Sequence, residues 1–364
     1  MFMLSGHVSK SLEDTREQRD FPGYTNGLMQ LTPGKWVMPS DFMDIADTIF
    51  EIKYGLNDVV CMDYPGSGGT ALQELVWTMR NNPDLDNPDA DLYLNHRVPH
   101  LEADAFMHSK KLPSTRSEVL NTFNSRCPNG NVEEHDIYLQ MALKAPGGRT
   151  FKTHLSPSLM SPNLLTDAKV VYIVRNPKDV CMAYYHISRL AKYISYDGSF
   201  GDFVSYFVND QLMFGPYWEY IREMWNQKEH PGLHIIQYEN LMSTPDWEIK
   251  RLNFFLGTNL TEEQMAKIVK YTSLKAMKQR AVLPLGYNPD EICEEYAKKE
   301  GGFYECGGVG DWMVKMNKSQ GTQIDSWTKQ NSKGLENLKF NYDKIIIRKD
   351  SCTVFDNEIR NGTS

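Results

Sequence analysis

An arginine at the end of an apolar run is the clearest sign of chemistry in this sequence. Residues 170–174 read VVYIV, which is typical of a buried strand, and Arg175 follows directly. Pro177 then opens a predicted helix, because proline fits the first helical turn, where its missing N–H is not needed. An arginine between the end of a strand and a helix N-terminus is well placed to bind an anion. This segment therefore predicts an anion-binding site.

A glycine-rich loop follows a second predicted strand, at 59–62. Residues 64–71 read YPGSGGTA and lead into a predicted helix from Thr70 to Arg80. Glycines let backbone N–H groups approach an anion, and the helix dipole adds partial positive charge. No Lys-Ser/Thr pair follows the last glycine, which disfavours a P-loop kinase or NTPase. The alternative interpretation is a tight turn without a ligand.

One histidine stands out among the nine in the chain. His154 closes the sequence Lys152-Thr153-His154, at the end of a short predicted strand. Histidine titrates near neutral pH and can take the proton from an attacking hydroxyl. A lone histidine is more often a hydrogen-bonded structural residue, and we interpret the other eight, including His186, in that way.

The elements around these motifs alternate between apolar strands and amphipathic helices. This alternation predicts one α/β domain with a doubly wound parallel sheet, whose ligand lies at the carboxyl ends of the strands. The predicted elements are a helix at 41–54, a strand at 59–62, a helix at 70–80, a strand end at 151–154, a strand at 169–174, a helix at 178–193, a helical block at 200–225, a strand at 233–238 and a helix at 262–271.

Three segments are expected along the chain. Residues 1–40 are polar and punctuated by glycine and proline, and we expect an N-terminal arm over the core. Residues 41–320 form the α/β domain, and 321–364 form a polar C-terminal tail. Within the domain, residues 83–135 are rich in Pro, Asp and Asn, which predicts a lid or an insertion on the substrate side.

The composition narrows the possible partners and the compartment. The formal net charge of −8 argues against nucleic acid and anionic membranes, which need a basic surface. Six scattered cysteines with no CxxC pair predict free thiols in a reducing compartment and no metal site. The sequence shows neither a signal-peptide pattern nor an apolar window of 18 residues, so we expect a cytoplasmic protein that does not bind membranes.

Taken together, these motifs resemble the cytosolic sulfotransferases. That family transfers a sulfuryl group from 3′-phosphoadenosine 5′-phosphosulfate (PAPS) to a hydroxyl or an amine. The resemblance covers about residues 57–312, and the stretch 157–163 looks most like the branch that contains retinol dehydratase. It implies the sulfotransferase fold with its P-loop-like phosphate cradle, PAPS as co-substrate and a small hydrophobic acceptor.

The resemblance also implies roles for single residues. His154 matches the family's general base, and Lys152 matches the lysine that faces the developing charge. The positions that match the family's PAPS-binding residues are Ser67, Gly68, Gly69 and Thr70 in the loop, Arg175 for the 3′-phosphate, Tyr238 and Thr272 for adenine, and Gly307 in the Gly…Gly-Asp-Trp frame.

Several PAPS-binding positions depart from the family's pattern. The family loop reads Tyr-Pro-Lys-Ser-Gly-Thr-Thr-Trp, and its lysine, first threonine and tryptophan are Gly66, Gly69 and Ala71 here. Loss of a positioned cation lowers a rate by about 10²–10³. At the 3′-phosphate clamp, a serine is replaced by Ala183 and an Arg-Lys pair by Glu305 and Cys306. Each lost charge-assisted hydrogen bond is worth about 1.5–3 kcal/mol, so we expect weak PAPS binding.

Three functions remain open. The first is a PAPS-dependent sulfotransferase, the second is an inactive relative that binds a small molecule, and the third is an enzyme with another anionic donor. Lys275 or Lys278 could replace the lost cations if Glu305 turns away. The family's dimer motif is absent, which leaves a monomer or a different dimer. Aromatic residues that could line an acceptor pocket, or simply belong to the core, are Phe106, Phe123, Tyr184, Phe214 and Trp218.

Overall fold

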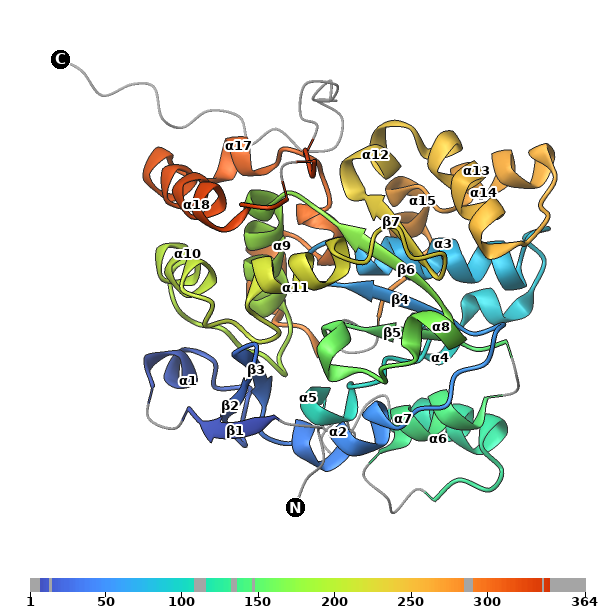
Figure 1. The fold of residues 1–364 in the computed structure, drawn as a ribbon, viewed down its shortest axis with the longest axis horizontal. Helices are drawn as coiled ribbons and strands as arrows, with labels where there is room; N and C mark the ends of the chain where they lie inside the picture. The colour runs from blue at the N-terminus through green and yellow to red at the C-terminus, as the bar shows by residue number, and fades with distance from the viewer. Residues whose placement is uncertain are drawn as a thin grey trace.

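Four parallel strands form the central sheet, in the order β5-β4-β6-β7 (Figure 1). This computed structural model describes residues 7–12, 15–107, 116–131, 136–145, 148–284, 291–335 and 337–340. The strands are β4 (Val59–Asp63), β5 (Thr150–Thr153), β6 (Lys169–Val174) and β7 (Leu233–Gln237). The predicted parallel sheet is confirmed, and β6 has the bounds expected from its apolar run.

Both faces of this sheet are buried, which explains why the central strands β4 and β6 are apolar along most of their length. On one face, Cys61 and Ile173 pack with helices α3 (Gly69–Asn81), α13 (Pro245–Leu256) and α14 (Glu262–Tyr271). The other face belongs to the main core. The sheet is therefore the middle layer of three, and its carboxyl edge holds Asp63 and the start of the glycine loop.

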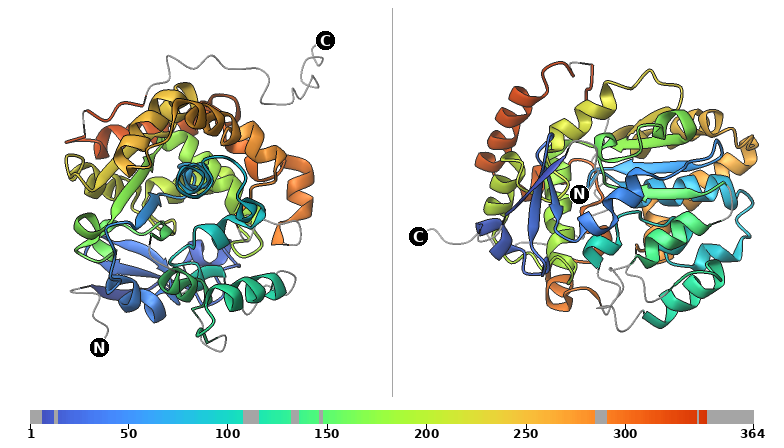
Figure 2. Two further views of the ribbon diagram at one scale, coloured as in Figure 1. Left: turned by 90° about the vertical axis from the view of Figure 1, so that its right-hand side faces the viewer. Right: turned by 60° about the horizontal axis from the view of Figure 1, so that its bottom comes forward.

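The N-terminal region is more structured than an arm. Strands β1 (Val8–Ser11), β2 (Leu28–Thr32) and β3 (Trp36–Pro39) form an antiparallel sheet, seen in blue in Figure 2. β2 and β3 carry most of the buried apolar residues of this sheet. In β3, Val37 exchanges backbone hydrogen bonds with Phe214 and Gly215, so the sheet supports a loop of the main domain.

The remaining helices surround the sheet (Figure 1). The described part of 83–135 contains several short helices and the eleven-residue α6, so the expected loop-rich insertion is partly helical there. Residues 321–331 continue α18 and bury Ile324 and Trp327, so the expected tail does not begin at 321; its end, 341–364, lies outside the described residues.

The bounds of these elements are α1 (Arg16–Asp20), α2 (Phe42–Phe50), η1 (Pro88–Asp91), α4 (Leu94–Arg97), α5 (Asp104–Met107), α6 (Arg116–Arg126), α7 (Ile137–Lys144), η3 (Pro157–Leu159), α8 (Leu164–Asp167), α9 (Pro177–Leu190), α10 (Phe200–Val208), α11 (Tyr217–Trp225), α12 (Tyr238–Ser243), α15 (Leu274–Gln279), α16 (Glu294–Glu300), η5 (Phe303–Cys306), α17 (Trp312–Lys315) and α18 (Lys318–Asn331).

Candidate functional site

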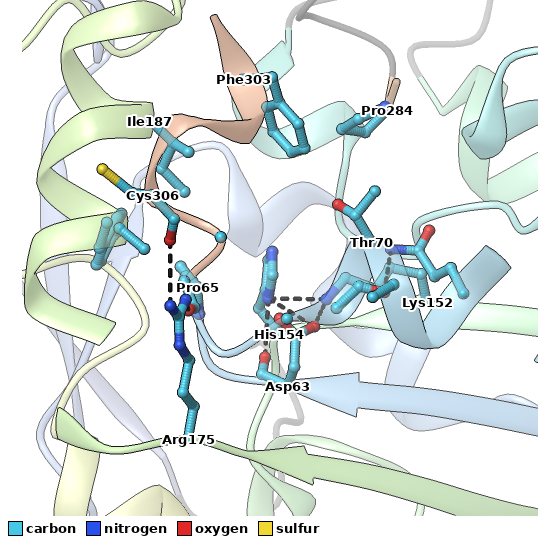
Figure 3. Close-up of a pocket in the computed structure, with 18 of the residues that line it drawn as sticks. Asp63, Pro65, Thr70, Lys152, His154, Arg175, Ile187, Pro284, Phe303 and Cys306 are labelled. Carbon is cyan, nitrogen blue, oxygen red and sulfur yellow. Dashed lines mark hydrogen bonds and ion pairs between the residues drawn. The ribbon is translucent and has the colours of Figure 1, made fainter. Parts of the chain in front are cut away.

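A cavity of about 150 Å³ lies at the carboxyl ends of β4, β5 and β6. Its walls are mostly apolar, and its polar groups come from two sides (Figure 3). The histidine side consists of His100, Glu102 and His154 with the aromatic residues around them. The loop side consists of Asp63, residues 66–70, Lys152, Arg175 and residues 306–308.

His154 presents one ring nitrogen to the cavity. Its Nδ1 lies 2.8 Å from the backbone carbonyl oxygen of Asp63, and a carbonyl oxygen can only accept, so we assign the proton to Nδ1. Nε2 then carries the lone pair, and Figure 3 shows the ring projecting into the cavity. Burial, Lys152 and His100 hold the pKa of His154 well below its usual value. The neutral imidazole is therefore ready to accept a proton at neutral pH.

A buried carboxylate holds this histidine in place. Glu102 accepts hydrogen bonds from the backbone N–H of His154 (2.5 Å) and from the Thr153 hydroxyl (2.8 Å). It also pairs with Nε2 of His100 at 2.8 Å. Burial opposes ionisation of Glu102, but these contacts outweigh it and lower its pKa.

The sequence interpretation of His100 as purely structural missed its position. Its ring stands 4.9 Å from that of His154, and both rings line the cavity. Pro99 and His100 add a parallel bridge beside Lys152 in β5, and this pairing brings His100 and Glu102 to the site. The His-x-Glu spacing, two residues apart at the end of an extended segment, was the only local signal for this pair.

On the loop side, three of the four predicted loop residues line the cavity. Gly68 precedes α3 with a φ of 106°, and Gly69 and Thr70 open the helix. Ser67 is buried, and its N–H bonds the carbonyl of Tyr64 at 2.9 Å, so it does not line the cavity. The cradle predicted from the glycines is thus formed by Gly68, Gly69 and Thr70.

Gly66 has a conformation that a lysine would adopt only with strain. Its φ is 87°, and a Cβ there would lie 2.8 Å from the carbonyl oxygen of Val180. Residues other than glycine rarely tolerate this region of φ. The loss of the family's lysine is therefore accompanied by a backbone that no longer suits it.

Arg175 lies where the sequence predicted it but binds the protein itself. Its guanidinium donates to the carbonyl oxygens of Gly66 (2.9 Å), Cys306 (3.1 Å) and Gly308 (2.5 Å). It also stacks on the ring of Tyr238 at 4.5 Å. The side chain is almost fully buried by these contacts.

The two residues predicted to contact adenine also have protein partners. The hydroxyl of Tyr238 donates to the carbonyl of Gly307 at 2.6 Å, and both residues line the cavity. The hydroxyl of Thr272 donates to Ile268 in its own helix at 2.9 Å, and Thr272 does not line the cavity. Ala71, at the position of the family's tryptophan, packs against Met277.

The residues that replace the family's 3′-phosphate clamp differ in whether they line the cavity. Ala183 and Cys306 line the cavity and pack together with Met182. Glu305 does not line it, and its carboxylate pairs with Lys278 at 2.9 Å, which is the orientation of the alternative that the sequence left open. The pair is partly exposed. Lys278 is engaged by Glu305 and does not line the cavity.

The five candidate aromatic residues divide between the cavity and the core. Phe106, Tyr184 and Phe214 line the cavity, and Phe214 stands 5.0 Å from the ring of His154. Phe123 and Trp218 belong to the core instead. The apolar wall beside the histidines suits a small hydrophobic molecule.

Within the described residues, three other features bear on the sequence predictions. No helix there is long and apolar enough to cross a membrane. No group of three or more His, Cys, Asp or Glu in that part of the chain is arranged to hold a metal ion. The cysteines at positions 61, 127, 181, 293 and 306 are free thiols, as their scattered spacing predicted.

Comparisons with known proteins agree with this architecture. Residues 56–336 match the sulfotransferase domain family. Luciferin sulfotransferase of Photinus pyralis is 30% identical over 294 residues, covering 78% of this chain and 74% of that protein. Sulfotransferase 1E1 of Bos taurus is 27% identical over 304 residues, covering 83% and 92%. The chain therefore belongs to the sulfotransferase family.

Solved structures extend the likeness to the fold. Retinol dehydratase in complex with retinol and PAP superposes with a TM-score of 0.77 at 24% identity, covering 92% of this chain and 99% of that one. The same enzyme with androsterone and PAP gives a TM-score of 0.72 at 23% identity, covering 93% and 99%. The predicted sulfotransferase fold is confirmed.

Proposed function

We propose that this protein transfers a sulfuryl group from PAPS to a hydroxyl or amine of a small hydrophobic acceptor, with His154 as general base. The observation that carries this proposal is the neutral His154, whose Nε2 faces a mostly apolar cavity beside Lys152 and the glycine loop. Proton removal by a positioned imidazole is worth about 10²–10⁴ in rate.

The proposed step forms one bond to sulfur and breaks another. The acceptor oxygen or nitrogen attacks the sulfur of PAPS and forms the new bond, while its proton passes to Nε2 of His154. The bond between sulfur and the bridging oxygen of the 5′-phosphate breaks, and 3′-phosphoadenosine 5′-phosphate (PAP) leaves. Lys152 lies next to His154, with Nζ 3.0 Å from its Nδ1, and is placed to face the charge that develops on the leaving oxygen.

The relatives support the acceptor class and the donor. One relative is named for luciferin, and the similar structures hold retinol or androsterone together with PAP. These are small molecules with large apolar parts, and this cavity has Phe106 and Phe214 beside its histidines. The free thiols of the described residues also fit the cytoplasmic location that we propose.

A second candidate function is that of a small-molecule binding protein that has lost its donor. The observation in its favour is that Arg175 and Tyr238 both donate to backbone carbonyls of residues 306–308. A nucleotide would have to displace this loop to reach them. The histidine side needs no such rearrangement to receive an apolar acceptor.

Two measurements on the purified full chain separate these functions. We expect calorimetric titration with PAP to give a Kd weaker than micromolar, and radiolabelled PAPS with a panel of phenols, alcohols and amines to give a slow labelled product. A labelled product that disappears in His154→Ala supports transfer. Acceptor binding without any PAP binding or product supports the second function and contradicts the first.

A further inference from the structure

A carboxylate that the sequence motifs do not mention lies within the loop side of the cavity. Asp63 is the last residue of β4, and its side chain is only 3% exposed. Its carboxylate contacts Nζ of Lys152, and Oδ1 lies 3.3 Å from Nδ1 of His154. Figure 3 shows Asp63 on the floor of the cavity, between Lys152 and His154.

Gly69 makes room for this carboxylate. A Cβ on Gly69 would overlap both carboxylate oxygens of Asp63. The family has a threonine at this position, and a side chain here would collide with the Asp63 carboxylate in this orientation. The carboxylate lies against the first residue of α3, a thirteen-residue helix whose N-terminal dipole favours an anion.

The cationic side chains among the described lining residues therefore already have partners within the protein. Among its described lining residues, the lysines and arginines are Lys152 and Arg175. Lys152 has Asp63 as its counter-ion. Burial holds the pKa of its ammonium group well below the usual value. Arg175 donates to three carbonyls. A charged ligand that enters the cradle must compete with Asp63 for Lys152.

We propose that Asp63 is a built-in anion that occupies the cradle and determines donor specificity by opposing charged groups there. The inference rests on the proposed function in one respect, namely that an anionic donor binds at this loop. A phosphosulfate close to Asp63 would meet a like charge in a site with little water, where charge interactions are strong. Replacement of Asp63 should therefore strengthen anion binding.

The test uses Asp63→Asn, which keeps the shape and removes the charge, and Asp63→Ser, which also vacates space. Each variant of the full chain is titrated calorimetrically with PAP and, separately, with inorganic pyrophosphate. We expect both variants to bind pyrophosphate and PAP at least about tenfold more tightly than the parent, which is roughly 1.4 kcal/mol. Glu263→Gln is the matched control, because it removes one charge from an exposed surface pair with Lys267 and should change neither affinity.

Thermal unfolding provides a second readout, because both variants leave Lys152 buried without its counter-ion. Pyrophosphate should raise the Tm of the variants more than that of the parent, since a ligand stabilises the state that binds it. If neither variant gains affinity for either anion, the inference is wrong. If neither folds even at high pyrophosphate concentration, it is also wrong, because an anion in the vacated place should take over the charge of Asp63.

The two anions distinguish this inference from the proposed function. If the Asp63 variants gain affinity for pyrophosphate but none of the proteins binds PAP, the role of Asp63 is supported and PAPS as donor is contradicted. Tight PAP binding by the parent that is unchanged in both variants supports PAPS as donor and contradicts the role of Asp63.

Discussion

The two sides of the cavity use their polar residues in different ways. On the histidine side, Glu102 takes up the surrounding donors, and Nε2 of His154 is left facing the cavity. On the loop side, the polar groups that match the family are engaged by the protein: Arg175 and Tyr238 by carbonyls, and Lys152 by Asp63. A residue that matches the family's motif therefore does not by itself imply the family's contact with a ligand. Partners within the protein determine whether its side chain is available to bind one.

The largest expected effect is on the histidine side. We expect His154→Ala to reduce sulfuryl transfer by about 10³-fold or more, because the attacking group then loses its base. The fold should survive, so the measurement is the transfer rate together with a circular dichroism spectrum. His230→Ala, outside the cavity, is the matched control. Undiminished transfer in His154→Ala would rule out the assigned role.

On the loop side, Arg175→Met should affect stability more than ligand binding. The change leaves three carbonyl oxygens without their donor, and we expect a loss of about 3 kcal/mol in the free energy of unfolding by denaturant titration. PAP affinity should change by less than about tenfold. Lys250→Met is the control, because Lys250 lies in an exposed pair with Glu262. A large loss of PAP affinity at unchanged stability would contradict this role.

Restoration of the family's lysine at position 66 should fail. We expect Gly66→Lys to destabilise the protein by about 1–3 kcal/mol without raising PAP affinity, because of the positive φ and the close carbonyl of Val180. Gly66→Ala isolates the backbone strain from the effect of charge. A gain in affinity with normal stability would show that the loop can return to a lysine-bearing conformation.

The pH dependence of transfer tests the protonation state of His154. Its pKa lies well below the usual 6.5, so the imidazole stays neutral and active until the pH falls through that lower value. We expect the acidic limb of kcat/KM to have its midpoint well below the usual 6.5, with about a tenfold loss per pH unit below it. A midpoint at or above 6.5 would mean that the base is exposed or is another group.

The smallest expected effect is at Glu305. Its carboxylate pairs with a largely exposed Lys278 and does not line the cavity, so Glu305→Gln should change PAP affinity by less than about threefold. Lys278→Met and the double variant complete a double-mutant cycle, which measures the interaction free energy of the Glu305–Lys278 pair. A change above tenfold in Glu305→Gln would place its charge within reach of the nucleotide.

Sequence patterns were most informative where local signals are strong. The run before Arg175 predicted β6 correctly, and the apolar spacing at 262–271 predicted α14. They failed where distant segments meet. The N-terminal sheet was hidden by glycine and proline turns, and α18 by a mostly polar composition with only Ile324 and Trp327 facing inward.

For the candidate site, the sequence located side chains but not their partners. The structure brings His154, Lys152, Arg175 and Tyr238 to one cavity, as the motifs predicted. The carbonyls that engage Arg175 come from residues more than a hundred positions away, and no local pattern reports them. In the sequence, Asp63 is typical of the end of a strand. Its role becomes apparent only from the position of its carboxylate against Gly69.

The pairing of Asp63 with Gly69 constrains the order in which the two positions can change. A chain with the carboxylate at 63 in this orientation and a side chain at 69 cannot form, because the two would overlap. On any path of single substitutions from a threonine-bearing loop, the carboxylate can therefore take this orientation only once glycine stands at 69. In the reverse direction, a threonine can return to 69 only if the carboxylate at 63 turns away or is replaced.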